Sequence, residues 1–532
     1  MSTAFHLPVA SLSSLWQRAL HTLRSLALIP DPEPVDYPFA ASDVAQMHRL
    51  CSDPDAAAID DASWKDLMLD QYRESLSQEV SIFGQHALYQ RLRAGGGAVH
   101  RDNVAALLAD PARAQQLRRD CKSLRHADTE IATLLFEDAA PPVPWWAART
   151  WPLPFLLIAS IGAVVWSPMA WLATGFILYL LISTQMRYHE RVEAWQRAMG
   201  SLHMLLRVVR LLGGADAAAA GKLNQQLTRS PLVNLTPGLR GYLDWFALAN
   251  LNHYFKGVRL VQARLDFLRD CFTRVANLEA DVALARHLHE VPAFCWVTKG
   301  EAGKLTLTDT VHPLLPHAQA LSVDLAGKGA FISGQNGIGK STLLRTVGLN
   351  LVAARAFGFC YARQALVPDL PVYTSMQSED SMLGGESLYM AELRRAQELL
   401  AAANGPHPGI CIIDEIFRGT NHLESVSAAA AVLDVLAAQG LVIVSSHNLV
   451  LGSLLAQRLT PLCVARTELG ELSLTPGVLA HTNGIALLGQ RGFGSAVEAR
   501  AGKVFDWLSG YLAHPGDCSG VLASAAVAAP MP

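Results

Sequence analysis

The stretch that decides the fold of this 532-residue chain is "FISGQNGIGKSTLLRTVGLN", residues 331–350. It contains the phosphate-loop pattern G-x-x-x-x-G-K-[ST]. The apolar run "GAFIS" leads into the loop and "KSTLLRTVGLNLV" follows it, so the sequence predicts a strand, a loop and a helix in that order. The backbone amides of such a loop bind a triphosphate at the positive end of the helix dipole. The pattern therefore predicts an ATP site.

The residues expected to bind the nucleotide follow one another along the loop. They are Gly334, Gln335, Asn336, Gly337, Ile338, Gly339, Lys340, Ser341 and Thr342. Lys340 is expected to bridge the β- and γ-phosphate oxygens, and the hydroxyl of Ser341 to bind Mg²⁺. ATP and Mg²⁺ are therefore the expected cofactors.

Two further strands end in residues that can complete an ATPase site. In "GICIIDEIFRGTN", residues 409–421, Asp414 is expected to hold Mg²⁺ and Glu415 to polarise the attacking water as general base or orienting group. "GLVIVSSH" ends in His447, which is placed to sense the γ-phosphate. A lone histidine is more often structural, and an Asp-Glu pair can also begin a helix. The second alternative does not explain the apolar residues directly before Asp414, so the motifs together predict a Mg-ATP hydrolase.

The pattern of apolar residues divides the chain into regions. From about residue 293, short apolar runs alternate with helical blocks, which is typical of an α/β domain with buried parallel strands. Upstream, apolar residues recur at helical spacing. The expected regions are a helical region at 1–140, a hairpin at 150–186, a helical lever and core region at 187–292, an ATPase domain at 293–515 and a disordered tail at 516–532.

The segment at 150–186, "TWPLPFLLIASIGAVVWSPMAWLATGFILYLLISTQM", carries no charge. It is too long for one membrane span, and its central Ser-Pro pair predicts a turn. Two helices of roughly 16 residues would each be about 24 Å long, near the lower limit for a hydrocarbon core of about 30 Å. Arginines flank both ends, which places both ends in the cytoplasm. We therefore expect a two-span transmembrane hairpin that anchors the chain in the lipid bilayer of the inner, cytoplasmic membrane. A buried helical hairpin or a re-entrant loop is the alternative.

The composition restricts the partners and the compartment. The chain has 43 basic and 46 acidic residues, so no global field draws it to nucleic acid, and a DNA contact would need a local basic patch. The eight cysteines lie far apart with no C-x-x-C pair, which argues against a zinc site or a disulfide framework and fits a reducing compartment.

Several motifs resemble those of the MutS mismatch-repair ATPases of the ABC superfamily. "GQNGIGKST" at 334–342 is similar to the phosphate loop of that family, and "DEIFRGT" at 414–420 to its D-E-I-G-R-G-T. "GGESLYMAEL" at 384–393 resembles the family's G-R-S-T-F-x-x-E-M. "VHPLL" at 311–315 and "HTNGIALLG" at 481–489 resemble its H-P and Y-G-I segments, and "FGQHALYQRLRAGG" at 83–96 is more weakly similar to the start of its core domain.

The resemblance implies a P-loop ATPase domain that works as a homodimer. In that family the serine matched by Ser387 reaches the γ-phosphate of the partner chain. ATP binding is then expected to close the dimer and to move the helical levers, and DNA becomes the expected target, with a further protein partner left open. Departures are Phe417 at a family glycine, Ile338 in the glycine-rich loop and Asn421-His422 in place of Ser-Thr. No segment resembles the mismatch-recognition domain, so we expect a membrane-anchored variant that lacks it.

Two other classes of function stay open at this level. One is a membrane scaffold whose nucleotide state controls partner binding without useful turnover. The other is an ABC-type transport or remodelling ATPase, although "LGGES" departs from the transporter motif L-S-G-G-Q. A Glu415→Gln substitution discriminates between them, because it would leave a scaffold intact and stop a machine that needs hydrolysis.

Overall fold

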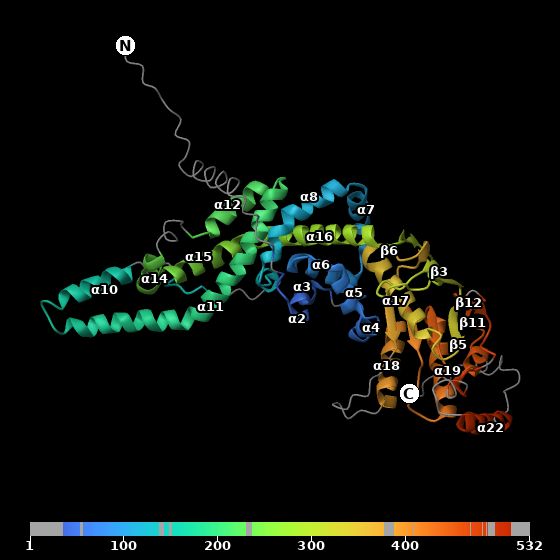
Figure 1. Cartoon of the computed structure of the whole chain (residues 1–532). Helices are drawn as coiled ribbons and strands as arrows, with labels where there is room; N and C mark the ends of the chain where they lie inside the picture. The colour runs from blue at the N-terminus through green and yellow to red at the C-terminus, as the bar shows by residue number, and fades with distance from the viewer. Residues whose placement is uncertain are drawn as a thin grey trace, which may run out of the picture.

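Figure 1 shows the computed structural model, with the sheets at one end and a helical hairpin projecting at the other. The structure describes residues 34, 36–53, 57–137, 143–147, 152–229, 237–376, 388–406, 408–468, 470–480, 482–485, 487 and 495–511. The tail expected to be disordered, 516–532, lies outside the described residues, as does Ser387.

The first part of the chain is a group of short helices, of which α5 to α9 pack on the long helix α16. They are α2 (Ala41–Val44), α3 (Gln46–Cys51), α4 (Asp61–Asp66), α5 (Leu69–Leu76), α6 (Ile82–Ala94), η1 (Gly97–Val99), α7 (Arg101–Ala109), α8 (Pro111–Cys121), η2 (Lys122–His126) and α9 (Ala132–Phe136). Helix α6 contacts α16 along a buried face that includes Phe83 and Phe272, whose ring centroids are 5.3 Å apart. These apolar contacts join the N-terminal helices to the middle of the chain.

The middle of the chain is also helical. Its helices are α10 (Pro152–Ala163), α11 (Ala170–Leu212), α12 (Ala217–Leu227), α14 (Pro237–Phe246), α15 (Ala249–Ala263) and α16 (Leu265–Glu290). Helix α11 packs against α12, α15 and α16. Figure 1 shows α16 lying between the hairpin and the sheets.

The expectation of a transmembrane hairpin is wrong. Within the described part of the chain, no helix is both long and apolar enough to cross a membrane. Helix α10 has 12 residues, about 18 Å at 1.5 Å per residue, because the turn takes up the residues between 163 and 170. Helix α11 is long, but its apolar first part soon meets Arg187, His189 and Glu190. The inference of a two-span protein anchored in the cytoplasmic membrane is withdrawn with it.

The hairpin nevertheless exists as two contacting helices, and much of its apolar surface is exposed. Trp146, just before the uncharged segment, lies in an aromatic cluster with Tyr188 and Phe255, at centroid distances of 5.8 and 5.7 Å. Trp146 is thus partly buried against α11 and α15.

The C-terminal part is built on a six-stranded sheet in the order β12-β11-β5-β10-β9-β8. Its strands are β5 (Gly329–Gly334), β8 (Val372–Ser375), β9 (Ile410–Asp414), β10 (Val442–Ser445), β11 (Leu459–Arg466) and β12 (Leu472–Pro476). All neighbours are parallel except β11 and β12. The helices of this part are α17 (Lys340–Phe357), α18 (Leu388–Ala403), α19 (His422–Gln439), α20 (Val450–Leu454) and α22 (Ser495–Tyr511).

Not all of the apolar runs enter the parallel sheet. A four-stranded sheet has the order β2-β7-β3-β4, and β1 pairs with β6. These strands are β1 (Cys295–Trp296), β2 (Thr298–Lys299), β3 (Lys304–Thr310), β4 (Leu321–Ala326), β6 (Phe359–Cys360) and β7 (Gln364–Val367). Strand β3 is antiparallel to both neighbours and alternates between buried and exposed residues, as a strand with one solvated face does. The α/β class is right, and the parallel pairing holds for the central sheet.

Candidate functional site

The phosphate loop connects β5 to α17, as the sequence predicts. Gly337 has φ 75° and Gly339, the residue before α17, has φ 110°, so both use the left-handed region that glycine tolerates. A Cβ on Gly337 would meet nothing within 4 Å, and one on Gly339 would meet only Leu472 Cδ1 at 3.9 Å. Gln335 and Asn336 are exposed. The loop is therefore an open cradle with room for a ligand at the N-terminus of an 18-residue helix.

Lys340 lies under this cradle and donates to the loop itself. Its Nζ donates to the carbonyl oxygens of Gly334 at 3.0 Å and Gln335 at 3.3 Å. Burial lowers the pKa of Lys340, while Glu415 and Asp414 oppose that shift. An ammonium group with two weak carbonyl partners at a desolvated position is well placed to exchange them for phosphate oxygens.

The acidic residues reach the same edge of the sheet. Asp414 ends β9, and its register partner is Ser445 at the end of β10, which in turn lies opposite Ile332 of β5. The Ser445 hydroxyl donates to Asp414 Oδ1. Because the carboxyl ends of parallel strands meet at one edge, Asp414 and the phosphate loop lie at the same crevice of the sheet.

Glu415 and His447 contact each other in this crevice. Glu415 Oε1 is 2.6 Å from His447 Nε2, and Glu415 Oε2 is 3.3 Å from Arg418 Nη1. The hydrogen bond with His447 is the largest cause that lowers the pKa of Glu415, and the charges of His447, Arg418 and Lys340 add to it. The Glu415 carboxylate is therefore ionised at neutral pH and held by two side chains.

Arg418 and Glu392 belong to this cluster, although no role was assigned to either from the sequence. Arg418 Nε is 3.5 Å from Glu392 Oε1, and Glu392 also accepts from the backbone N–H of Gly419 at 3.2 Å. Glu392 is 4% exposed as a side chain and comes from α18. Its position in "GGESLYMAEL", five residues after Ser387, was the available signal. Ser387 itself cannot be placed, because it lies outside the described residues.

Asn483 is a second residue that sequence reasoning quoted without a role. Its side-chain oxygen accepts from the backbone N–H of Asn336 at 2.9 Å, and its Nδ2 donates to the carbonyl of Asn336 at 3.4 Å. The segment that resembles the family's Y-G-I motif thus contacts the phosphate loop. It ties the late part of the domain to the nucleotide cradle.

Magnesium would have few protein ligands here. The described part of the chain has no group of three or more His, Cys, Asp or Glu side chains that could hold a metal ion. The hydroxyl of Ser341 and the carboxylate of Asp414 are hard oxygen donors, which suit Mg²⁺. Mg²⁺ commonly binds through one or two protein oxygens together with waters and substrate phosphates, so this donor set fits a Mg-nucleotide complex.

Phe417 takes the position of the family glycine with a left-handed backbone. Its φ is 56°, and the side chain is 1% exposed, with its ring centroid 6.1 Å from that of Tyr389. The φ angle explains why glycine fits at this position. The buried ring explains how a phenylalanine is kept there, because its packing offsets the strain.

We expect Phe417→Gly to lower the free energy of unfolding. Loss of the ring costs about 3–5 kcal/mol and relief of strain returns about 1–3 kcal/mol, leaving a net loss of about 2 kcal/mol. Urea denaturation followed by circular dichroism measures it. Phe417→Ala should be less stable still, because it loses the packing and keeps the strain. A glycine variant as stable as the wild type would contradict this account.

The comparisons with known proteins point to one family. Residues 330–469 match the family model of MutS domain V. This match begins within β5 and covers the phosphate loop, β9 and β10, and thus Lys340, Asp414, Glu415 and His447. This part of the chain is therefore similar to domain V of the MutS proteins.

Individual relatives agree with the family match. The chain is 32% identical over 184 residues to DNA mismatch repair protein MSH3 of Phaeosphaeria nodorum, which covers 33% of this chain and 16% of that protein. It is 29% identical over 245 residues to DNA mismatch repair protein MutS of Thermus aquaticus, covering 44% and 30%. Endonuclease MutS2 of Thermus thermophilus is 30% identical over 222 residues, covering 37% and 28%. The chain thus matches less than a third of the length of each of these relatives.

Proposed function

We propose that this chain binds and hydrolyses Mg-ATP at the edge of its parallel sheet, and that nucleotide binding closes a homodimer of its C-terminal part. The observation that carries the proposal is the convergence of Lys340, Asp414 and Glu415 at the carboxyl ends of β5 and β9, the two strands on either side of β10, beside an open glycine cradle. A purified chain should release phosphate from ATP in the presence of Mg²⁺ and stop when EDTA is added. Absence of Mg-dependent turnover would contradict the proposal.

Each residue of the site has a separate role in this proposal. The loop amides and Lys340 would hold the phosphates, and Ser341 and Asp414 would hold Mg²⁺, which supplies positive charge to the transferred phosphoryl group. Glu415 would orient the attacking water. In the present arrangement, His447 and Arg418 hold the Glu415 carboxylate. Hydrolysis therefore requires that the Glu415 carboxylate turn away from His447 and Arg418 towards the attacking water. Until the site closes, these two contacts would slow turnover.

Movement of the phosphate-loop helix would reach the helical region through direct contacts. The Asn350 side chain on α17 accepts from the backbone N–H of Tyr361 at 2.7 Å. The Tyr361 hydroxyl is 2.8 Å from Tyr72 Oη of α5 and 2.8 Å from His287 Nε2 of α16. Burial lowers the pKa of His287 to about 4, so this imidazole is neutral at pH 7. The chain of hydrogen bonds links the ATPase domain to the long helix that leads back towards the hairpin.

The homodimer is proposed from the family resemblance and from the exposed face of the phosphate loop. A second chain would cover this face and contribute Ser387. We expect Ser387→Ala to bind ATP normally and to hydrolyse it at least about tenfold more slowly, because one hydrogen bond to a developing charge is lost. Steady-state turnover with saturating Mg-ATP measures this. A variant as fast as the wild type would exclude the shared site.

DNA is the target that the names of the relatives suggest, and we propose it as the partner whose binding the nucleotide controls. If so, purified chain should retain duplex DNA on filters at low salt, and the affinity should fall steeply as salt rises, because phosphate contacts release counterions. Absence of salt-sensitive retention at low ionic strength would exclude DNA as the partner. The nucleotide would then control the binding of another partner.

A further inference from the structure

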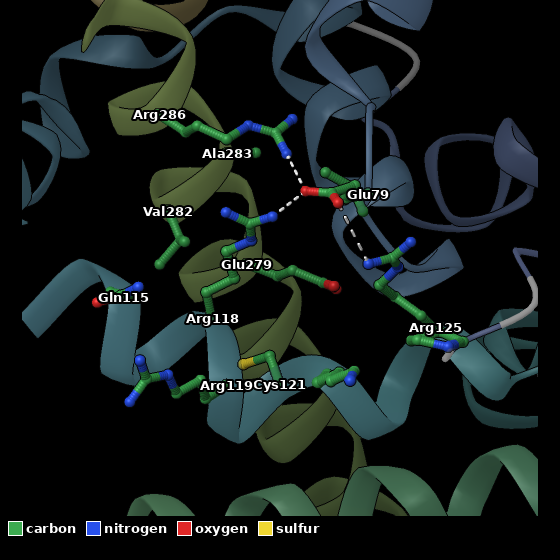
Figure 2. Close-up of a pocket in the computed structure, with 13 residues that line it drawn as sticks. Glu79, Gln115, Arg118, Arg119, Cys121, Arg125, Glu279, Val282, Ala283 and Arg286 are labelled. Atoms are coloured by element: carbon green, nitrogen blue, oxygen red, sulfur yellow. Dashed lines mark hydrogen bonds and ion pairs between the residues drawn. The ribbon is translucent and has the colours of Figure 1, made fainter. Parts of the chain in front are cut away.

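A basic pocket lies in the helical region and shares no residue with the phosphate loop. Its volume is about 410 Å³. Figure 2 shows it between α8, the short helix η2, α16 and the turn that precedes α6. Five basic side chains line it: Arg118, Arg119, Lys122, Arg125 and Arg286. Among the residues that the structure describes, two acidic side chains, Glu79 and Glu279, join them in the lining.

Glu79 is the centre on which three of the arginines converge. Arg118 contacts Glu79 Oε2, Arg286 Nη1 is 2.9 Å from the same oxygen, and Arg125 Nη1 is 3.8 Å from Oε1. Figure 2 shows these three guanidinium groups around the one carboxylate. A single carboxylate cannot neutralise three guanidinium charges. Asp36 also binds Arg125, yet the described residues of the lining keep an excess of positive charge.

The second acidic residue is engaged elsewhere. Glu279 accepts hydrogen bonds from the backbone N–H of Ser81 at 2.9 Å, from the Ser81 hydroxyl and from the backbone N–H of Gly84 at 3.0 Å. These are donors at the start of α6, so Glu279 stabilises the first turn of that helix. Burial raises the pKa of Glu279. Arg119 and Lys122 have no ionic partner within the described residues.

Glu79 is also held in an unusual backbone conformation. Its φ is 56°, a region that costs a non-glycine residue about 1–3 kcal/mol. Its side chain is 42% exposed, so solvent and solutes reach the carboxylate. Guanidinium groups surround a bound phosphate in the same way as these three arginines surround the exposed carboxylate of Glu79.

We propose that this pocket binds a small ligand with a pyrophosphate group, in which one phosphate takes the place of the Glu79 carboxylate and the other contacts Arg119 and Lys122. The volume lies within the range of small-molecule sites, about 300–1,000 Å³, and suits a ligand of the size of a nucleotide. The site is distinct from the phosphate loop. Helix α6 begins just after Glu79 and packs against α17, so the pocket is joined to the ATPase domain through one helix.

Calorimetric titration of the full chain with inorganic pyrophosphate and with ADP tests the proposal. Every protein carries Lys340→Ala, so that the phosphate loop contributes little. The pocket variant adds Arg119→Glu and Lys122→Glu. A matched control adds Arg113→Glu and Lys222→Glu, which change the charge equally at exposed positions outside the pocket.

The Lys340→Ala protein should bind pyrophosphate in a salt-sensitive manner. The pocket variant should bind it at least about tenfold more weakly, and the control should stay within about twofold. If ADP binds more tightly than inorganic pyrophosphate, and the pocket variant loses this binding, the ligand is a nucleotide. No binding of either ligand, or equal binding by the pocket variant and the control, would overturn the proposal. The proposal would also be overturned if duplex DNA bound through Arg119 and Lys122 while pyrophosphate did not bind.

Discussion

Glu415→Gln should bind ATP as tightly as the wild type and hydrolyse it about 10²–10⁴-fold more slowly. The amide has the shape of the carboxylate and still accepts a hydrogen bond from His447, so the crevice should keep its structure. It lacks the negative charge that orients and polarises the attacking water. Single-turnover hydrolysis and equilibrium binding of ATP separate the two effects.

The matched control for this experiment is Glu468→Gln, an exposed glutamate of the same domain, which should hydrolyse ATP within about twofold of the wild type. A Glu415→Gln protein with normal turnover would contradict the role of Glu415. If its turnover stopped while its effect on the partner persisted, the nucleotide-switched scaffold would be the correct account of the function.

Lys340→Ala should weaken ATP binding by about tenfold to a hundredfold, because hydrogen bonds from a charged donor contribute about 1.5–3 kcal/mol. Among the described residues, the ammonium group donates to the carbonyls of Gly334 and Gln335, and neither contact joins the loop to another part of the fold. The fold should therefore tolerate the substitution. Equilibrium titration with ATP and Mg²⁺ measures the affinity.

Lys328→Ala serves as the control for the lysine variant. Lys328 is an exposed residue just before β5 whose Nζ donates to the carbonyl of Ala456, away from the loop. Its removal should leave ATP affinity unchanged. Equal affinities of Lys340→Ala and Lys328→Ala would show that the loop does not bind phosphate through its lysine.

The phosphate loop and the acidic strand could be predicted because their signals are local. An apolar strand followed by a glycine loop and Lys340 specifies its own geometry, and the ends of parallel strands bring Asp414 to the same edge. Arg418 and Glu392 could not be placed in this way. Their contact depends on how α18 packs beside the segment that follows β9, and no spacing in the sequence encodes that distance.

For the hairpin, the sequence signal was clear but its interpretation was wrong. The lack of charge over 150–186 predicted two membrane spans, but the predicted helix lengths included residues that in the structure belong to the turn. The basic pocket could not be predicted either, because no sequence motif marks it. Glu79, Arg118 and Arg286 come from three separate segments, and only the packing of α8 and α16 on the turn before α6 brings them together.

The central claim is that Mg-ATP joins two copies of the C-terminal part at a shared site. The most direct measurement is the mass of the Glu415→Gln protein in solution, by analytical ultracentrifugation over a range of concentrations, with and without saturating Mg-ATP. We predict a species of twice the mass of one chain that requires Mg-ATP and is absent when Lys340→Ala is added. A strictly monomeric protein at every concentration with Mg-ATP bound would contradict the claim.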